Sequence, residues 1–177
     1  MTTGAICSSS LGLSRMMTSN IGVENAEVVV ELGPGTGAIT RSILPKLKQK
    51  SDFFAVELNE SVISVFKERF PDCDIYHESA AKLPELLRQR GKKNANVILS
   101  GLPWASFPDS LQDELLSAIL KSLPDGGAFA TFAYLQGVVL PAGMKFRKKL
   151  HSFFSSVELS PVVWMNLPPA FVYRCRK

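Results

Sequence analysis

The sequence contains little cysteine and little histidine, with three and two residues among 177. Cys7, Cys73 and Cys175 lie far apart, which excludes a disulfide framework and a zinc-ligand cluster and fits a reducing cytoplasm. His77 and His151 are isolated, so the sequence predicts no metal site. The longest apolar runs are strand-length, well short of the roughly 20 residues that a membrane-spanning helix needs. No basic leader precedes the short apolar stretch at the start of the chain, so we expect a cytoplasmic protein.

The composition is that of a folded domain with a modest positive charge. Hydrophobic residues make up 46% of the chain, enough for a core on both faces of a sheet. We expect one domain over 1–177, with an N-terminal helical segment at 1–25 and a sheet core at 26–177. The formal net charge of +4 is uneven, since basic residues gather at 145–149 and 174–177. These cations are either solvated polar faces or groups that attract phosphate on a lipid or a nucleic acid.

Strand-like and helix-like patterns alternate from Val28 onward, which predicts an α/β fold with a mostly parallel sheet covered by helices on both faces. A helix is expected from about Gly37, shortened by Pro45. An apolar loop is expected at 136–143, followed by a basic helical stretch to about 154. Strands are predicted at 28–32, 53–57, 74–77, 96–99, 128–134, 157–159 and 170–175, with further helices at about 60–70, 84–90 and 110–123.

The first predicted strand runs into Gly33-Pro34-Gly35-Thr36-Gly37, which places three glycines at alternate positions directly after Glu31-Leu32. Glycine permits positive φ and lacks the side chain that would keep a ligand away from the backbone, and the following helix points its amide groups at the same place. Glu57 ends the next apolar run about twenty residues further on, where a carboxylate can take both hydroxyls of a ribose. Together these residues predict a nucleoside-binding site. For the glycines alone, a tight structural turn is the alternative.

The loops after the third and fourth strands should reach the same crevice, because open α/β sheets bind ligands at the carboxyl ends of their strands. Ser79 and Ala80 follow the third strand, and either Ser79 or its neighbour Glu78 can contact a ligand or cap the next turn. The fourth strand runs into Ser100-Gly101-Leu102-Pro103-Trp104. This loop therefore adds a hydroxyl, a proline turn and an aromatic ring to the predicted crevice.

These motifs resemble those of the class I S-adenosyl-L-methionine (SAM) methyltransferases. The resemblance implies SAM as the cofactor and a Rossmann-like sheet of seven strands in the order 3-2-1-4-5-7-6, with strand 7 antiparallel. It also implies that the turn holds the amino-acid half of SAM, that Glu57 holds the ribose and that the loop after strand 3 meets the adenine. The cofactor-binding residues predicted in this way are Glu31, Leu32, Gly33, Pro34, Gly35, Thr36, Gly37, Glu57, Leu58, Ser79, Ala80 and Ser100.

Methyl transfer to an amine needs an unprotonated nitrogen aligned with the leaving sulfur, and positioning supplies much of the reduction in barrier. In amine-directed methyltransferases the loop after strand 4 carries a polar oxygen and a ring that covers the substrate, whose face attracts the developing cation. Ser100 and Trp104 are the candidates for these roles, and Tyr134, at the end of strand 5, could face the crevice. A buried Trp and a core Tyr are the structural alternatives. The predicted catalytic residues are Ser100, Leu102, Pro103, Trp104 and Tyr134.

Two methyltransferase families share the Glu-Leu-Gly-Pro-Gly-Thr-Gly turn. They are the ribosomal RNA adenine dimethylases, whose acceptor loop is usually Asn-Leu-Pro-Tyr, and the phospholipid N-methyltransferases, which make phosphatidylcholine from phosphatidylethanolamine. The chain resembles the second family in three segments, 4–17, 100–103 and 166–174, although Cys7-Ser8 departs from the usual pattern. We therefore expect a SAM-dependent N-methyltransferase that acts on phosphatidylethanolamine-type headgroups.

The sequence leaves three alternatives open. The first is an enzyme like the rRNA adenine N6-dimethyltransferases, against which the missing C-terminal helical domain counts. The second is an N-methyltransferase of a small soluble amine, because the basic amphipathic helix that usually precedes the Gly4-Ala5 segment in the lipid family is not seen. The third is a SAM-fold protein kept as a binding or assembly factor. If the substrate is a lipid, we expect peripheral contact with the inner face of an anionic membrane through 138–141 and the cations at 145–149.

Overall fold

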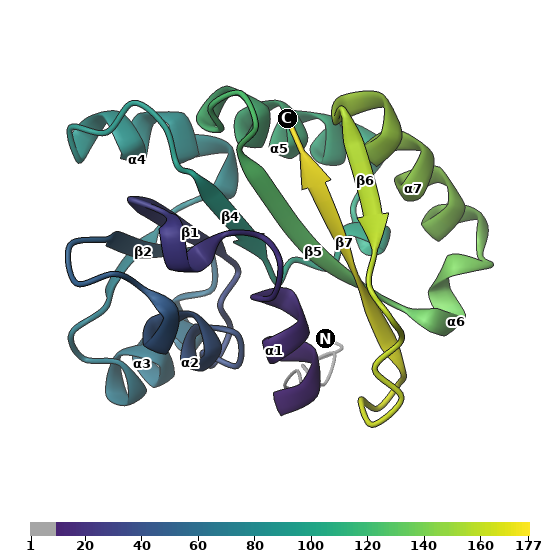
Figure 1. Ribbon diagram of the computed structural model, residues 1–177, viewed down its shortest axis with the longest axis horizontal. Helices are drawn as coiled ribbons and strands as arrows, with labels where there is room; N and C mark the ends of the chain where they lie inside the picture. Colours follow the sequence, from purple (N-terminus) through teal and green to yellow (C-terminus); the bar gives the residue numbers. More distant parts are fainter. Residues whose placement is uncertain (1–9) are drawn as a thin grey trace.

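Seven strands form one sheet in the order β3-β2-β1-β4-β5-β7-β6. Only β7 runs against its neighbours, because it pairs antiparallel with both β5 and β6 while every other pairing is parallel. This order and the antiparallel seventh strand confirm the fold prediction. The computed structural model describes residues 10–177 (Figure 1). The strands are β1 Val28–Leu32, β2 Asp52–Glu57, β3 Asp74–His77, β4 Val97–Ser100, β5 Ala128–Tyr134, β6 Ser156–Leu159 and β7 Ala170–Arg176.

Helices cover both faces of the sheet, and the alternation of side chains along the strands divides the core accordingly. On β1, Val28, Val30 and Leu32 point into the cluster that includes α4, α5 and α7, whereas Val29 points into the cluster that includes α1 and α2. All five β1 residues are buried, as expected for a central parallel strand. The α-helices are α1 Leu11–Met17, α2 Thr40–Ile43, α3 Glu60–Arg69, α4 Leu83–Gln89, α5 Asp109–Ser122, α6 Leu135–Val138 and α7 Pro141–Phe153, and the 3₁₀ turns are Val23–Asn25, Leu44–Lys46, Ala80–Lys82 and Trp104–Ser106.

Besides shifts of one residue at other element ends, three differences between the local structure and the sequence-based expectation bear on the site. The helix expected from Gly37 is the short α2, which passes into a 3₁₀ turn at Pro45. The fourth strand ends at Ser100 rather than at residue 99. The expected apolar loop at 136–143 is wrong: α6 occupies 135–138, and α7 begins at Pro141, which can start a helix because its first turn needs no N–H donor there.

The register of the central strands brings three loops to one level at the carboxyl edge of the sheet. Leu32 pairs with both Val56 and Ser100. The Gly33 amide donates to the Val56 carbonyl at 2.8 Å, and the Gly101 amide donates to the Leu32 carbonyl at 2.8 Å. The residues that follow β1, β2 and β4 are therefore held side by side.

An ion-pair cluster joins α4 to the outer strands. Arg90, the residue after α4, donates to both carboxylate oxygens of Asp52, to Asp74 at 2.8 Å and to the Tyr76 hydroxyl at 3.0 Å. Its guanidinium carbon lies 4.9 Å from the centre of the Phe54 ring. These hydrogen bonds hold the pKa of Arg90 above its usual value. One side chain thus ties the start of β2 to β3.

The beginning of the chain is described only in part. The expected helical segment at 1–25 contains α1 and a 3₁₀ turn, but residues 1–9, with most of the Gly4–Ser10 motif and Cys7, lie outside the described residues. Within residues 10–177, no helix is both long enough and apolar enough to span a membrane.

Candidate active site

The glycine turn leaves its backbone open toward solvent-accessible space. Gly33, Gly35 and Gly37 all have positive φ, between 56° and 84°. A Cβ placed on Gly35 would meet nothing within 4 Å, so this position is glycine for its conformation and because a ligand can approach its backbone closely. The turn can therefore hold a nucleoside cofactor against the main chain.

The Glu57 carboxylate lies between the glycine turn and the start of α3. Its Oε1 accepts hydrogen bonds from the amides of Leu58 and Asn59, both at 3.0 Å, and its Oε2 accepts one from the Gly35 amide at 3.3 Å. These contacts fix the carboxylate next to the turn, and Glu57 and Gly35 both line the same cleft. An anchored carboxylate beside an open glycine backbone fits the ribose of SAM.

Glu31 lies beneath the turn and does not line the cleft. Its side chain is fully buried, its Oε2 accepts a hydrogen bond of 2.6 Å from the Thr40 hydroxyl, and its Oε1 has no partner within the described part of the chain. Burial raises the pKa of Glu31 from 4.5 to about 7, although the hydrogen bonds from Thr40 oppose this shift. The carboxyl group is therefore an unusual acid held under the cofactor turn.

The acceptor loop, residues 101–108, is shaped by the side chain that ends β4. The Ser100 hydroxyl is fully buried and accepts hydrogen bonds from the Trp104 indole at 3.0 Å and the Leu102 amide at 3.3 Å. The Trp104 side chain is 2% exposed, and its ring stacks on the Phe146 ring with 5.2 Å between the ring centres. From below, Gln112 donates to the carbonyl of Trp104 at 2.8 Å.

The first residue of the acceptor loop touches the glycine turn directly. A Cβ on Gly101 would lie 2.5 Å from the Gly33 carbonyl oxygen, a distance that real Cβ atoms do not show. Leu102 packs over Gly33 from the same loop. The cofactor turn and the acceptor loop are thus in backbone contact, and residue 101 cannot carry a side chain unless one of them moves.

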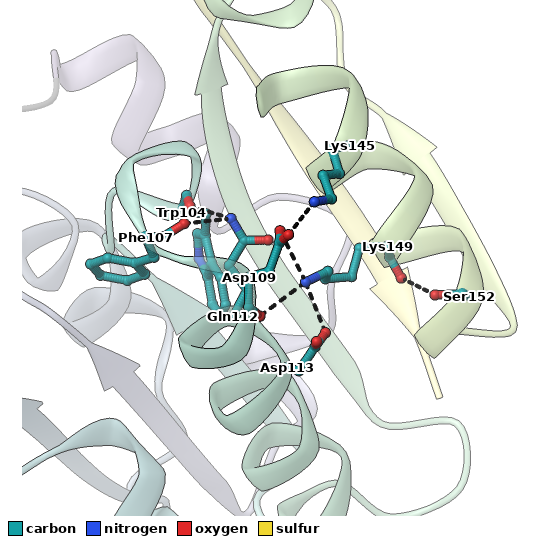
Figure 2. Close-up of polar contacts among 8 residues, drawn as sticks. All are labelled: Trp104, Phe107, Asp109, Gln112, Asp113, Lys145, Lys149 and Ser152. Atoms are coloured by element: carbon teal, nitrogen blue, oxygen red, sulfur yellow. Dashed lines mark hydrogen bonds and ion pairs between the residues drawn. The ribbon is translucent and has the colours of Figure 1, made fainter. Parts of the chain in front are cut away.

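Helix α7 is fastened to the start of α5 by ion pairs (Figure 2), and to the acceptor loop by ring stacking. Asp109 is ion-paired with both Lys145 and Lys149, and Lys149 also reaches Asp113 at 2.8 Å. The hydrogen bond from Lys145 holds the pKa of Asp109 below its usual value. Because Asp109 is solvent-exposed, these pairs add little stability, and the stacked Trp104 and Phe146 rings provide most of the attachment.

The glycine turn, the acceptor loop and the corner between α6 and α7 enclose one cleft of about 510 Å³. Its titratable lining residues are Glu57, Tyr134 and Tyr173, and burial raises the pKa of Tyr173, which keeps that hydroxyl neutral. The rest of the lining is mostly apolar. A methyl donor can occupy the end near the turn, while the α6–α7 end accommodates an acceptor.

The structure brings some of the predicted site residues together and leaves others away from the cleft. Gly33, Pro34, Gly35, Thr36, Glu57, Leu102, Pro103, Trp104 and Tyr134 line it. The remaining predicted residues do not: Glu31, Leu32, Gly37, Leu58, Ser79, Ala80 and Ser100. Sequence reasoning missed the far wall, formed by Phe132, Gly137, Val138, Gly143, Phe146 and Tyr173, for which the sequence carries no local motif.

Two predicted roles need revision on physical grounds. The Ser100 hydroxyl faces the core and holds Trp104, so it is placed to position the loop rather than to touch an acceptor. The Trp104 side chain is 2% exposed and has one ring face against Phe146, so only a small part of it borders the cleft. At the end of β3, the Ser79 hydroxyl caps a 3₁₀ turn by accepting from Ala81 at 3.2 Å, and Glu78 is exposed.

Comparison with known proteins agrees with this geometry, although no protein-family model matches the chain. The chain is 33% identical to the ornithine lipid N-methyltransferase of Singulisphaera acidiphila, over 97% of this chain and 87% of that protein. It is 31% identical to ribosomal RNA small subunit methyltransferase A of Clostridium acetobutylicum, over 46% of this chain and 31% of that protein.

Solved methyltransferases share the fold at low sequence identity. The O-methyltransferase of Bacillus cereus in complex with SAH has a TM-score of 0.70 and 9% identity, over 93% of this chain and 80% of that one. The N-methyltransferase NodS of Bradyrhizobium japonicum has a TM-score of 0.66 and 12% identity, over 86% of both chains. The chain is therefore a class I methyltransferase with SAM as its cofactor, and it belongs to the family of SAM-dependent N-methyltransferases that includes the ornithine lipid N-methyltransferase.

Proposed function

We propose that the protein methylates the amine of a membrane-lipid headgroup, of the ornithine lipid or phosphatidylethanolamine type. The observation that carries this proposal is the cleft itself, which continues from the glycine turn into a mostly apolar space between the acceptor loop and the α6–α7 corner. A headgroup amine attached to acyl chains suits such a space, whereas a small polar amine would find few polar partners there. The relative that matches nearly the whole chain acts, by its name, on ornithine lipid.

On the cofactor side, the residues of the turn and Glu57 hold SAM. The open backbone at Gly35 and the anchored Glu57 carboxylate fit its nucleoside, and Glu31 supports the turn from beneath. SAM supplies an electrophilic methyl group when it is bound. The contact of Gly101 with Gly33 then sets the distance between the donor and the acceptor loop.

On the acceptor side, the protein orients the amine with phenol oxygens. Tyr134 and Tyr173 line the cleft from β5 and β7, and a phenol oxygen can accept a hydrogen bond from the amine and direct its lone pair. Leu102 and Pro103 line the wall next to the donor. Ser100 and Trp104 are positioning residues that hold this loop in place.

The adenine dimethylase alternative fits this chain less well. When its Asn-Leu-Pro-Tyr loop is aligned on Leu102-Pro103, Gly101 stands at the position of the asparagine. An asparagine at 101 would clash with the Gly33 carbonyl, since even a Cβ would lie 2.5 Å from it. The similarity to the ribosomal RNA enzymes also covers only about half of this chain.

The proposal is tested by incubating the protein with methyl-labelled SAM and vesicles that contain ornithine lipid or phosphatidylethanolamine. We expect label in the lipid fraction, and none in free ornithine, phosphoethanolamine or immature small-subunit RNA supplied instead. Label in a soluble amine or in RNA without lipid label would overturn the proposal. A Tyr134→Phe variant should lower kcat/KM for the lipid about tenfold while the Kd for SAM stays within about twofold of the wild-type value.

A further inference from the structure

The exposed large apolar side chains of residues 10–177 gather at one edge of the sheet. This is the edge where the parallel strands end and where the cleft opens. Leu58 follows β2, Leu159 ends β6, and the others belong to the start of α1, to the α6–α7 corner and to the β6–β7 connection, which Figure 1 shows at the same edge as α6. The full set is Leu11, Leu58, Val139, Leu140, Met144, Leu159, Trp164, Met165 and Leu167.

Two of these groups lie next to each other at the mouth of the cleft. The Leu135 amide, at the start of α6, donates to the Pro169 carbonyl at 2.8 Å, so the β6–β7 connection is tied to the α6–α7 corner. Val138 lines the cleft, and the exposed residues follow it directly in the chain. We call this surface the apolar rim: Val139, Leu140, Met144, Trp164, Met165 and Leu167.

The exposure on the apolar rim is large for side chains of this kind. Met165 is 89% exposed, Leu167 77% and Trp164 67%. The opposite edge of the sheet carries polar connections instead, with Lys92 and Lys93 before β4. A clustered apolar surface on one side of the molecule marks a contact site.

Cations border the apolar rim. Lys145, Arg147 and Lys148 follow Met144 on α7. Lys145 is ion-paired with Asp109, whereas within residues 10–177 neither Arg147 nor Lys148 has an ion-pair partner. Apolar and indole side chains flanked by free cations complement an interface of acyl chains and anionic headgroups.

We propose that the apolar rim inserts into the surface of an anionic bilayer and sets the mouth of the cleft on the membrane plane. A lipid amine then reaches the cleft while its acyl chains stay in the bilayer. This inference rests on the proposed function, because it gives the route by which that substrate arrives. It commits to a bilayer as the occupant, since the rim combines an exposed Trp with free cations and adjoins the opening of the site.

Binding is measured without any amine lipid and without SAM, so that the result does not depend on methyl transfer. The chain has two Trp residues, of which Trp104 is 2% exposed and Trp164 is 67% exposed. We expect a blue shift of Trp emission when vesicles of phosphatidylcholine and phosphatidylglycerol are added, and no shift in the Trp164→Phe variant. Absence of co-sedimentation with these vesicles would overturn the inference.

Two variants test the apolar and the charged parts separately. A Leu140→Ser/Leu167→Ser double variant should bind at least about tenfold more weakly, because both side chains are exposed and can change without disturbing the core. An Arg147→Glu/Lys148→Glu variant should also lose about tenfold or more, while the matched Lys92→Glu/Lys93→Glu variant, with the same change in net charge, should bind like the wild type. Equal losses in the two charge variants would refute a specific docking edge.

The outcomes for this inference and for the proposed function are distinguishable. Vesicle binding with no label transferred to any amine lipid leaves the docking edge in place and removes the lipid substrate. Label transfer to detergent-dispersed lipid without vesicle binding leaves the lipid substrate in place and removes the docking edge. If the wild type is a dimer that the Leu140→Ser/Leu167→Ser variant converts to a monomer, the rim is an interface between copies and the membrane assignment is wrong.

Discussion

Replacing Glu31 by glutamine should remove a pH dependence of stability that the wild type carries near neutrality. The Glu31 carboxyl is fully buried and accepts a hydrogen bond from the Thr40 hydroxyl, and burial raises its pKa from 4.5 to about 7. Between these two values the folded protein holds a proton that the unfolded chain has released. The contribution of Glu31 to the free energy of unfolding is therefore largest below about pH 4.5. It falls as the pH rises and levels off above about pH 7.

The size of the effect follows from the two pKa values. Each pKa unit corresponds to about 1.4 kcal/mol, so the change from 4.5 to about 7 removes about 3 kcal/mol from the free energy of unfolding. Glutamine is neutral at every pH and can still accept the Thr40 hydrogen bond. Wild type and Glu31→Gln should thus be about equally stable at pH 4.5 to 5, while at pH 8 the variant should be more stable by about 3 kcal/mol.

Urea unfolding of both proteins across this pH range, without SAM, measures the difference directly, because the contributions of all other groups cancel between the two. A Thr40→Val variant provides a second check. Loss of the hydrogen bond from the Thr40 hydroxyl should raise the pKa of Glu31 further. The fall in stability with rising pH should therefore extend to higher pH in this variant than in the wild type. Parallel pH profiles for wild type and Glu31→Gln would refute the assignment of a protonated carboxyl beneath the turn.

Four further substitutions test the site and the fold. Ser100→Ala and Trp104→Phe should each destabilise by about 1 to 3 kcal/mol, and the double variant by less than their sum, since both remove the same buried hydrogen bond. Gly101→Ala should lower kcat at least about tenfold, because its Cβ would lie 2.5 Å from the Gly33 carbonyl. Arg90→Lys should cost about 2 kcal/mol of stability, since lysine cannot bridge both carboxylates.

Each of these has its own control. Additive losses at Ser100 and Trp104 would contradict the shared hydrogen bond. A Gly101→Ala variant that keeps the wild-type kcat would contradict the clash. Arg88→Lys, on the exposed side of α4, should leave the unfolding midpoint unchanged.

The sheet and the cofactor turn could be predicted from the sequence because their signals are local. Apolar runs mark the strands, and the glycines mark the turn by a backbone conformation that other residues adopt poorly. The far wall of the cleft has no such signal. Phe146 and Tyr173 come from α7 and β7, far from Trp104 in the sequence. The antiparallel pairing of β7 with β5 places Tyr173, and the packing of α7 on the acceptor loop places Phe146.

The role of Ser100 is harder to predict from the sequence, and strand geometry explains why. Side chains on β4 alternate between faces, and Ile98 points into the cluster that contains Trp104, whereas Val97 and Leu99 point to the opposite face. Ser100 shares the face of Ile98, so its hydroxyl meets the Trp104 indole inside the core rather than the cleft. The next residue, Gly101, is the first at the edge, and the Gly33 carbonyl forbids a side chain there. The acceptor loop therefore offers backbone and the Ser106 side chain rather than a side-chain amide, and the opposite side of the cleft contributes the phenols of Tyr134 and Tyr173 to the recognition of the amine.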